Sequence, residues 1–316
     1  MRALVLDSSG PHAVADHRPR LRDGEATIAL RVGGVCATDL ELCKGYMGFA
    51  GVLGHEWVGE VVDAPDGEWI GQRVVGDINC PCGVCATCRA GRPTHCPTRT
   101  VLGIDGRDGA FSERFSLPTA NLHRVPDLVA DEAAVFVEPL AAACEIVQQL
   151  HVKPSDRAVV IGVGRLGQLC ARVLALTGAD VAGVGRRSAS LDLLPRSVRP
   201  VLADAIEGEK GADIVVDCTG SAEGLAIATS IVRPRGTVVM KTTIHDVQGV
   251  TPIPWIIDEV TLVGSRCGPF APALRLLAAG LIDPTPLISA EFDLQDGVAA
   301  LEAAASRDRM KVLVRP

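Results

Sequence analysis

The sequence has 316 residues, of which 47% are hydrophobic, 22% are charged and only 3% are aromatic, and its formal net charge is −7. This length suits two domains rather than one, with cores built from aliphatic side chains. The acidic balance argues against nucleic acid or an anionic membrane as a partner, because both require a basic face, and it favours small-molecule chemistry.

The N-terminal segment MRALVLDSSG lacks the long apolar stretch of a signal peptide, and no later run approaches the roughly 18 apolar residues of a membrane span. We therefore expect a cytosolic protein that does not bind membranes. Eleven cysteines are present, and four of them crowd into residues 82–96. In a reducing compartment this pattern indicates metal binding rather than disulfides, with redox pairing as the alternative.

The predicted elements change in kind along the chain. Residues 3–75 alternate short Val, Leu and Ile runs with Gly and Asp, which predicts an all-β region. Residues 77–100 lack hydrophobic periodicity, so we expect a surface lobe held by something other than burial. Beyond residue 139, apolar strands alternate with helical stretches, which predicts a parallel sheet. The predicted strands are 158–161, 181–184, 214–216 and 237–240, and the predicted helices are 141–150, 166–176, 222–232 and 270–279.

Four cysteines of the lobe are separated by two, two and seven residues: Cys82, Cys85, Cys88 and Cys96. Four thiolates on so short a loop can close a tetrahedron around Zn²⁺ with no open position, which is the structural type of zinc site. Cys80 is a fifth thiol two residues upstream, and spacing alone leaves open that it replaces Cys82. His95 is expected to be a surface histidine.

A glycine-rich turn, I-G-V-G-R-L-G, joins the strand 158–161 to the helix 166–176. Gly162 makes the tight turn, Gly164 lets the backbone approach a pyrophosphate, and Gly167 allows close helix packing. This is the dinucleotide-binding fingerprint in the context that it requires. The residues expected at the cofactor are Gly162, Gly164, Arg165, Leu166, Gly167, Gly185, Arg186, Arg187, Ser188, Thr219 and Gly220.

The acid that would bind the ribose hydroxyls of NAD, about 20 residues beyond the fingerprint, is missing. The strand ends instead in Gly185, which is followed by Arg186, Arg187 and Ser188. No carboxylate therefore repels a 2′-phosphate, and two guanidinium groups can bind it. We expect NADP(H) to be favoured over NAD(H); the alternative is two solvated arginines at a helix start.

Further polar residues form three dispersed motifs: G-V-C-A-T-D with Cys36, Thr38 and Asp39, G-H-E with His55 and Glu56, and V-E-P-L with Glu138. Each motif is weak by itself, and the information lies in the set and its order. With this set the sequence resembles the zinc-containing medium-chain dehydrogenases over nearly the whole chain. In that family the catalytic zinc is held by a Cys in G-x-C-x-[ST]-D, a His in G-H-E and a later acid or Cys.

The resemblance implies roles for individual residues. Cys36 and His55 would be zinc ligands, Glu138 the third ligand or a water-bridged neighbour, and Glu56 an exchangeable ligand. Glu138 followed by P-L-A-A-A is similar to the polyol and threonine dehydrogenase branch, and the Gly after Cys82 favours Cys82 over Cys80 in the structural site. In lacking this acid, the sequence resembles the NADP-preferring members of the family. Two zinc ions per subunit are therefore expected.

A zinc with three protein ligands leaves one position for an alcohol oxygen and lowers the pKa of that oxygen, so that hydride can pass to nicotinamide. Thr38 is placed to pass the hydroxyl proton toward solvent, unless it only caps a turn. Asp39 would accept a hydrogen bond from His55, unless it only caps a helix. The substrate pocket is expected to include Tyr46, Met47 and Phe49.

The expected fold is α/β plus β: a GroES-like, β-rich catalytic domain of residues 1–139 and 266–316, and a doubly wound Rossmann domain of residues 140–265, with the active site in the cleft. We expect reversible oxidation of an alcohol or polyol by a homodimer or homotetramer. Two alternatives are a non-catalytic cofactor-binding or thiol redox-sensing protein and a zinc-free quinone or enoyl reductase. The dispersed polar set disfavours the first, and both metal motifs disfavour the second.

Overall fold

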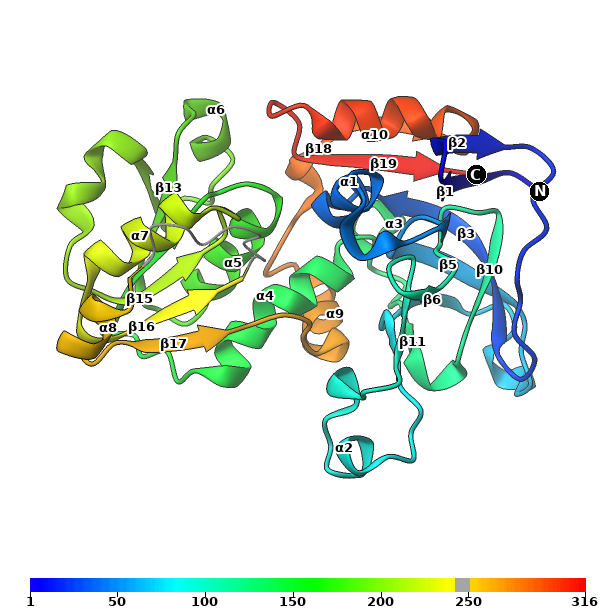
Figure 1. The fold of residues 1–316 in the computed structure, drawn as a ribbon, viewed down its shortest axis with the longest axis horizontal. Helices are drawn as coiled ribbons and strands as arrows, with labels where there is room; N and C mark the ends of the chain where they lie inside the picture. The colour runs from blue at the N-terminus through cyan, green and yellow to red at the C-terminus, as the bar shows by residue number, and fades with distance from the viewer. Residues whose placement is uncertain (242–250) are drawn as a thin grey trace. The chain divides into compact units, whose positions relative to one another are not determined.

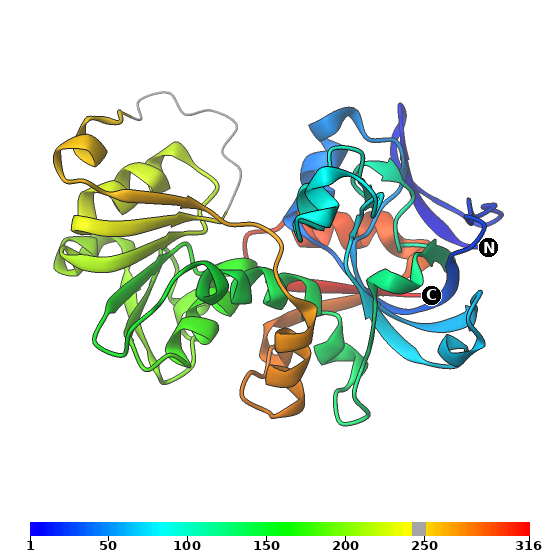
Figure 2. The same ribbon diagram turned by 90° about the horizontal axis from the view of Figure 1, so that it is seen from below.

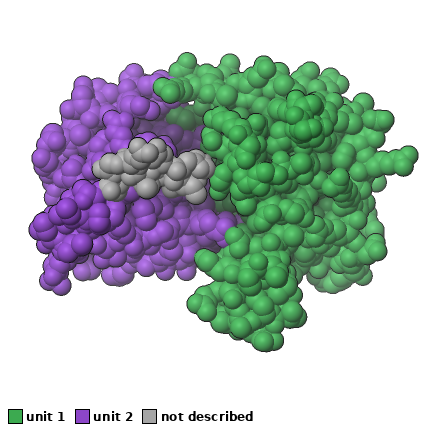
Figure 3. Space-filling view, viewed as in Figure 1, with its two compact units in different colours: residues 1–138, 273–316 green, residues 139–272 purple. Residues whose placement is uncertain are grey.

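The computed structural model describes residues 1–241 and 251–316. The chain divides into two compact units, which are coloured separately in Figure 3. Unit 1 comprises Met1–Glu138 and Ala273–Pro316, and unit 2 comprises Pro139–Pro272. Both chain termini lie in unit 1 (Figures 1 and 2).

Unit 1 is built around a mixed, mostly antiparallel sheet of seven strands. Its order is β11-β6-β5-β3-β19-β18, with β10 also paired to β3. The central strand β3 has buried side chains at every second position over its first half, at Ala26, Ile28 and Leu30, which is the period of a strand with one face in the core. The strands are β3 (Ala26–Gly34), β5 (Glu56–Asp63), β6 (Arg73–Gly76), β10 (Arg114–Leu117), β11 (Leu122–Arg124), β18 (Ile288–Asp293) and β19 (Lys311–Arg315).

A second sheet, β2-β1-β4, completes the core of unit 1. Helix α10 (Gly297–Ala305) lies along β18 and β19 (Figure 1) and buries Leu301 in the core cluster that also contains Leu4 and Leu53. The strands of this sheet are β1 (Ala3–Asp7), β2 (Gly10–Val14) and β4 (Gly51–Val52). The pairing of β19 with β3 joins the two chain segments of unit 1 in one sheet.

The prediction of an all-β region over residues 3–75 is wrong where helical segments interrupt the strands. Helix α1 (Ala37–Cys43) follows β3, and the 3-10 turns η1 (Tyr46–Gly48) and η2 (Gly67–Trp69) lie further along. The carboxylate of Asp39 accepts the N–H of Cys36 at 2.8 Å and so caps the first turn of α1. Seven residues are too few to show a helical apolar period among the β-type runs that flank them.

Residues 77–100 form a segment that extends from the rest of unit 1 and carries α2 (Figure 1). Its regular structure is short: β7 (Asn79–Cys80), α2 (Ala86–Arg89), η3 (Pro93–His95) and β8 (Thr100–Leu102), with β9 (Gly106–Arg107) beside β8. Val84 at its tip is 70% exposed. Hydrophobic burial therefore contributes little to the tip of this lobe.

Unit 2 contains a six-stranded parallel sheet in the order β14-β13-β12-β15-β16-β17. This is the strand order of a doubly wound dinucleotide-binding sheet, so the expected Rossmann fold is confirmed. The strands are β12 (Arg157–Ile161), β13 (Asp180–Gly185), β14 (Val198–Leu202), β15 (Ala212–Asp217), β16 (Val232–Met240) and β17 (Thr261–Gly264). The two edge strands were not predicted, because β14 contains Arg199 and Pro200 and β17 is partly exposed.

Four of the longer helices follow the predicted helical stretches, whereas α10 was not predicted. These four are α4 (Val137–Gln149), α5 (Arg165–Ala175), α7 (Ala222–Ile231) and α9 (Phe270–Ala278). Helix α4 begins four residues earlier than predicted, so that Glu138 lies inside its first turn. The shorter helices and turns are α3 (Asp131–Ala134), α6 (Ser188–Leu191), α8 (Ile253–Ile257), η4 (Thr119–Asn121), η5 (Ala203–Glu209), η6 (Thr285–Leu287) and η7 (Leu294–Asp296). Among residues 1–241 and 251–316, none of the helices is long and apolar enough to cross a bilayer.

Candidate functional site

Two strand ends bring three of the predicted ligands together in unit 1. β3 ends two residues before Cys36, and the antiparallel strand β5 begins directly after His55. Ligand atoms of Cys36, His55 and Glu56 all lie within 4.8 Å of one another. His55 and Glu56 are buried, whereas Cys36 is half-buried. Antiparallel pairing thus converts two separate sequence motifs into one candidate metal-binding group.

Asp39 fixes the backbone around this group. Its side chain is fully buried, and its two carboxylate oxygens accept the N–H groups of Cys36 at 2.8 Å and of Gly54 at 3.2 Å. His55 Nδ1 lies 3.3 Å from Asp39 Oδ1, but it has no hydrogen-bond partner among the described residues. Although burial opposes it, the charges of Asp39 and Cys36 raise the pKa of His55. Asp39 therefore ties the start of α1 to the loop that carries His55.

Glu56 is paired with a lysine that the sequence analysis did not consider. The Lys311 ammonium on β19 donates to Glu56 Oε2, and both side chains are buried. Gly34 of β3 lies between the two strands, and a Cβ atom there would be 3.0 Å from Glu56 Oε2 and 3.4 Å from Lys311 Cδ. The missing side chain at Gly34 leaves room for this ion pair across β3. The sequence gives one indication of this pair, a single Lys at the start of the otherwise apolar run K-V-L-V.

Glu138 lies near the group but outside the set of atoms within 4.8 Å. Burial, together with the carboxylates of Glu56 and Asp77, raises the pKa of Glu138 to about 7, although the charges of His55 and Lys311 oppose the shift. Carboxylates crowded in a low-dielectric site repel one another unless a cation balances them. A thiol, an imidazole and carboxylates form the donor set that zinc takes, so these residues fit the expected ion.

The other residues predicted near the catalytic site have mixed positions. The Cys36 thiol donates to Thr38 Oγ1 at 3.7 Å, so Thr38 directly neighbours a candidate ligand. Tyr46 and Phe49 pack in part against the hydrophobic core of unit 1. Met47 is 55% exposed and has a φ of 57°. Their contribution to a substrate pocket stays a prediction.

The lobe brings together the four cysteines at 82, 85, 88 and 96. All four sulfur atoms lie within 4.8 Å of one another. The Sγ–Sγ distances are 3.4 Å for Cys85 and Cys88, 3.9 Å for Cys85 and Cys96, and 3.6 Å for Cys82 and Cys96. A tetrahedral zinc with Zn–S bonds of about 2.3 Å requires sulfur atoms about 3.8 Å apart. The Cys82 N–H, which donates to Cys96 Sγ, and the Thr98 hydroxyl together lower the pKa of the Cys96 thiol to about 6. The cluster therefore fits a structural zinc.

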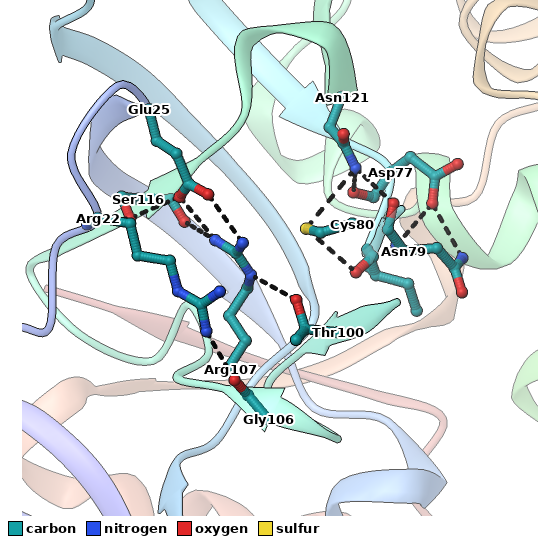
Figure 4. A network of polar contacts seen from close by, with 11 residues as sticks. Arg22, Glu25, Asp77, Asn79, Cys80, Thr100, Gly106, Arg107, Ser116 and Asn121 are labelled. Atoms are coloured by element: carbon teal, nitrogen blue, oxygen red, sulfur yellow. Dashed lines mark hydrogen bonds and ion pairs between the residues drawn. The ribbon is translucent and has the colours of Figure 1, made fainter. Parts of the chain in front are cut away.

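Cys80 and His95 lie outside the four-sulfur cluster. Cys80 is buried at the base of the lobe, where the Asn121 amide donates to its sulfur at 3.8 Å. The same amide donates to the carbonyls of Asp77 and Asn79 at 2.8 and 2.7 Å (Figure 4). Burial raises the pKa of Cys80 to about 11, so this thiol is protonated near neutral pH. His95 is exposed, as expected.

A second polar network holds the strands next to the lobe. The Arg107 guanidinium forms two contacts with the Glu25 carboxylate, at 2.6 and 2.8 Å, and donates to Thr100 Oγ1 at 3.2 Å (Figure 4). Arg107 is buried, and its partner Ser116 donates to Glu25 at 2.9 Å. The base of the lobe is thus fixed by bonds that use none of the four clustered thiols.

In unit 2 the predicted cofactor residues meet at the carboxyl ends of three adjacent parallel strands. The glycine turn follows β12, and the N–H groups of Gly162 and Val163 donate to the carbonyl of Val184 on β13 at 2.9 and 3.3 Å. A Cβ atom at Gly167 would lie 2.1 Å from Gly162 O, so only glycine permits this close approach. Gly164 faces open space, since a Cβ atom at Gly164 would have no other atom within 4 Å. The turn therefore fits a bound pyrophosphate.

The flanking predicted residues lie on either side of this turn. Gly185 ends β13 and is buried, whereas Arg186, Arg187 and Ser188 are exposed directly after it. Thr219 follows β15 on the other side, and its hydroxyl donates to Asp217 Oδ1 at 2.7 Å. Arg165, Leu166 and Gly220 complete the set at the first turn of α5 and after β15. The structure thus groups all the predicted cofactor residues at the edge where doubly wound sheets bind their ligands.

Comparisons with known proteins agree with this geometry. Residues 22–127 match the family described as the alcohol dehydrogenase GroES-like domain. The chain is 31% identical to 2-dehydro-3-deoxy-L-galactonate 5-dehydrogenase of Pseudoalteromonas atlantica, with 99% of this chain and 97% of the relative covered. It is 27% identical to sorbitol dehydrogenase of Halalkalibacterium halodurans, with 100% and 99% covered.

Among solved structures, a dehydrogenase from Sinorhizobium meliloti described as zinc-binding, and bound to NADP, is 27% identical and has a TM-score of 0.90. The similarity covers 100% of this chain and 99% of that structure. The expected GroES-like domain and the family resemblance are both confirmed. The chain therefore belongs to the zinc-type medium-chain alcohol dehydrogenase family and is an oxidoreductase that acts on alcohols.

Proposed function

We propose that this protein is an NADP(H)-dependent zinc dehydrogenase that interconverts a secondary alcohol of a polyol or sugar acid with the matching ketone. The observation that carries the proposal is the convergence of Cys36, His55 and Glu56 at the ends of β3 and β5. The names of the relatives, a sugar-acid dehydrogenase and a sorbitol dehydrogenase, support the substrate class. Residues 1–139 and 266–316 would supply the catalytic groups, and residues 140–265 the cofactor site.

Two zinc ions per chain are part of the proposal. Cys36 and His55 would hold the catalytic ion together with the carboxylate of Glu56 or Glu138, and the four lobe cysteines would hold the structural ion. When bound, the catalytic ion supplies a Lewis acid for an alcohol or carbonyl oxygen. Lys311 already pairs with Glu56 within the site, so we favour Glu138, whose pKa is raised to about 7, as the carboxylate that a bound ion would keep charged.

Proton transfer, ligand positioning and cofactor binding would fall to the protein's own residues. Thr38, half-buried beside Cys36, is placed to accept the substrate hydroxyl proton and pass it toward solvent. Asp39 holds the backbone of Cys36 and Gly54, and through them the spacing of Cys36 and His55. The glycine turn from Gly162 to Gly167 would hold the pyrophosphate of the cofactor, whose nicotinamide accepts or donates the hydride.

We expect kcat/KM for NADP(H) to exceed that for NAD(H) by about tenfold or more, because a charge-assisted contact from Arg186 or Arg187 to the 2′-phosphate contributes about 1.5–3 kcal/mol. The measurement uses a panel of polyols, sugar acids and simple alcohols with both cofactors. Replacing both arginines by alanine should bring the two cofactors to within about threefold of each other. A parent enzyme that uses NAD(H) better would contradict the cofactor assignment.

The reverse test is to introduce a carboxylate with Gly185→Asp, and the structure shows what an added side chain would meet there. A Cβ atom there would lie 2.9 Å from Val163 Cγ2 and 3.2 Å from Leu191 Cδ2, so an added side chain must displace both neighbours. Gly185→Ala is therefore the steric control for Gly185→Asp. A shift toward NAD(H) in the aspartate variant alone would show a carboxylate effect, whereas equal losses in both variants would show crowding.

A homo-oligomer joined through unit 2 is the last part of the proposal. β17 is an edge strand, and Ile253, Ile256 and Ile257 of the neighbouring helix α8 are 59%, 73% and 73% exposed. Unpaired edges and clustered exposed isoleucines are typical of surfaces covered by a partner. We expect light scattering to give at least a dimer, and Ile256→Glu with Ile257→Glu to give a monomer. Leu128→Glu, at an 88% exposed site in unit 1, is the control that should stay oligomeric.

A further inference from the structure

A chain of buried hydrogen bonds in unit 2 connects the glycine turn to the segment that carries the two arginines. Gln168 is fully buried and Arg172 is 8% exposed, and both lie on α5, one turn apart. The Gln168 amide nitrogen donates to the carbonyl of Ser190 at 2.6 Å and to that of Val163 at 3.3 Å. One side chain therefore spans the glycine turn and α6.

Arg172 fixes the orientation of that amide. Its Nη1 donates to Gln168 Oε1 at 2.6 Å and to Gln168 O at 3.1 Å, and its Nη2 donates to the carbonyl of Leu193 at 2.7 Å. Because the amide oxygen accepts from a cation, the amide nitrogen must face the carbonyls of Ser190 and Val163. Through its bond to the Leu193 carbonyl, the guanidinium also holds the segment after α6.

The segment held in this way has little structure of its own. Helix α6 has four residues, which is too short for a helix to be stable alone, and its Ser188 carbonyl accepts the N–H of Asp192 at 2.8 Å. Gln168 and Arg172 donate to two carbonyls of this segment, those of Ser190 and Leu193. Arg187 is the residue that precedes α6, and Arg186 comes before it. Both arginines therefore lie in a short segment whose near end is fixed by β13 and whose far end is fixed by the buried pair.

We propose that Gln168 and Arg172 are positioning residues for cofactor selection, which set the distance between the pyrophosphate turn and the arginines that face the 2′-phosphate. The inference rests on the proposed use of NADP(H). Neither residue would touch the cofactor. Gln168→Met keeps the length and burial of the side chain but removes both donated bonds, so α6 loses its tie to the turn while Gly162, Gly164 and Gly167 remain.

The test is calorimetric binding of NADP⁺ and NAD⁺ without substrate, together with the melting temperature. In Gln168→Met the Kd for NADP⁺ should rise about tenfold and that for NAD⁺ less than about threefold. A tenfold change corresponds to about 1.4 kcal/mol, which is the upper end of what one buried hydrogen bond contributes. Arg172→Met should show the same direction. Arg172→Lys, which can still donate to Gln168 Oε1, should stay near the parent ratio.

Arg157→Met is the matched control. Arg157 begins β12, at the opposite end of the strand from the glycine turn, and donates to Gly208 O at 2.7 Å and to Glu209 Oε2 at 2.9 Å. This variant should lower the melting temperature without changing the ratio of the two Kd values. If Gln168→Met behaves in the same way, the pair only stabilises the fold and the proposal is overturned.

The parent protein separates this inference from the proposed function. If the parent prefers NADP⁺ and the ratio does not move in Gln168→Met, the inference fails and the cofactor assignment stands. If the parent prefers NAD⁺, the cofactor assignment fails. In that case the positioning role survives only if Gln168→Met weakens NAD⁺ binding by about tenfold, and it falls if the Kd stays within about threefold of the parent.

Discussion

Cys36→Ser and His55→Ala should each remove one of two zinc ions and lower kcat/KM by at least about 10³-fold, while NADP⁺ binding in unit 2 stays near the parent value. Loss of a residue that only orients a zinc ligand costs about 10- to 100-fold, so loss of a ligand itself should cost more. The measurements are zinc content by mass spectrometry, steady-state kinetics and calorimetric cofactor binding. Two zinc ions in the parent are the starting point for this comparison.

The choice of substitutions keeps folding separate from chemistry. The Asp39 carboxylate accepts the backbone N–H of Cys36, and serine retains that bond and is itself favoured at the start of a helix. Cys43→Ser, at the last residue of the same helix, is the matched control and should keep both zinc ions and full turnover. Near-normal activity in Cys36→Ser or His55→Ala would end the assignment of the catalytic ion.

Cys88→Ser should release the other zinc ion and lower the melting temperature by about 5 °C or more, while part of the turnover remains. A closed four-thiolate site contributes folding energy rather than chemistry, and 1 kcal/mol corresponds to roughly 2–4 °C in a domain of this size. The networks of Asn121 and Arg107 fix the base of the lobe without the clustered thiols. The damage should therefore be confined to the lobe, which proteolysis within residues 82–96 would detect.

Cys80→Ala and Cys82→Ala form the matched pair for this prediction. The structure places Cys82 in the four-sulfur cluster and Cys80 at the buried base, so the Cys82 variant alone should lose zinc. Two zinc ions and an unchanged melting temperature in Cys88→Ser would mean that something other than a metal holds the lobe. Zinc loss in Cys80→Ala but not in Cys82→Ala would show that Cys80, and not Cys82, is the zinc ligand.

Much of unit 2 could be predicted from the sequence because its inner strands are buried on both faces. β12, β13, β15 and the second half of β16 each contain a short apolar run, and the glycine turn marks where the first of these strands ends. The edge strand β14 carries Arg199 and Pro200 because one side of it faces solvent, so its composition is that of a loop. Helix α1 was missed because seven residues hold too little periodicity.

The candidate site was predictable where short motifs carry its residues and not where tertiary packing does. Cys36, His55 and the lobe cysteines stand in patterns whose spacing has a chemical meaning. Lys311 is more than 250 residues from Glu56 in sequence, and only the β3–β19 pairing shows that the two side chains meet. Gln168 and Arg172 are likewise ordinary helix residues in the sequence, and only the burial of their contacts distinguishes them.

The pairing of β19 with β3 also has a consequence for biosynthesis. A ribosome adds residues 139–272 before residues 311–315, so unit 2 is complete while unit 1 still lacks the strand between β3 and β18. Until then Glu56 has no Lys311 beside it, and the sheet end that carries Cys36 and His55 is open on one side. We therefore expect the proposed catalytic ion to bind only after β19 has been translated, whereas the lobe cysteines could take up the proposed structural zinc on the nascent chain.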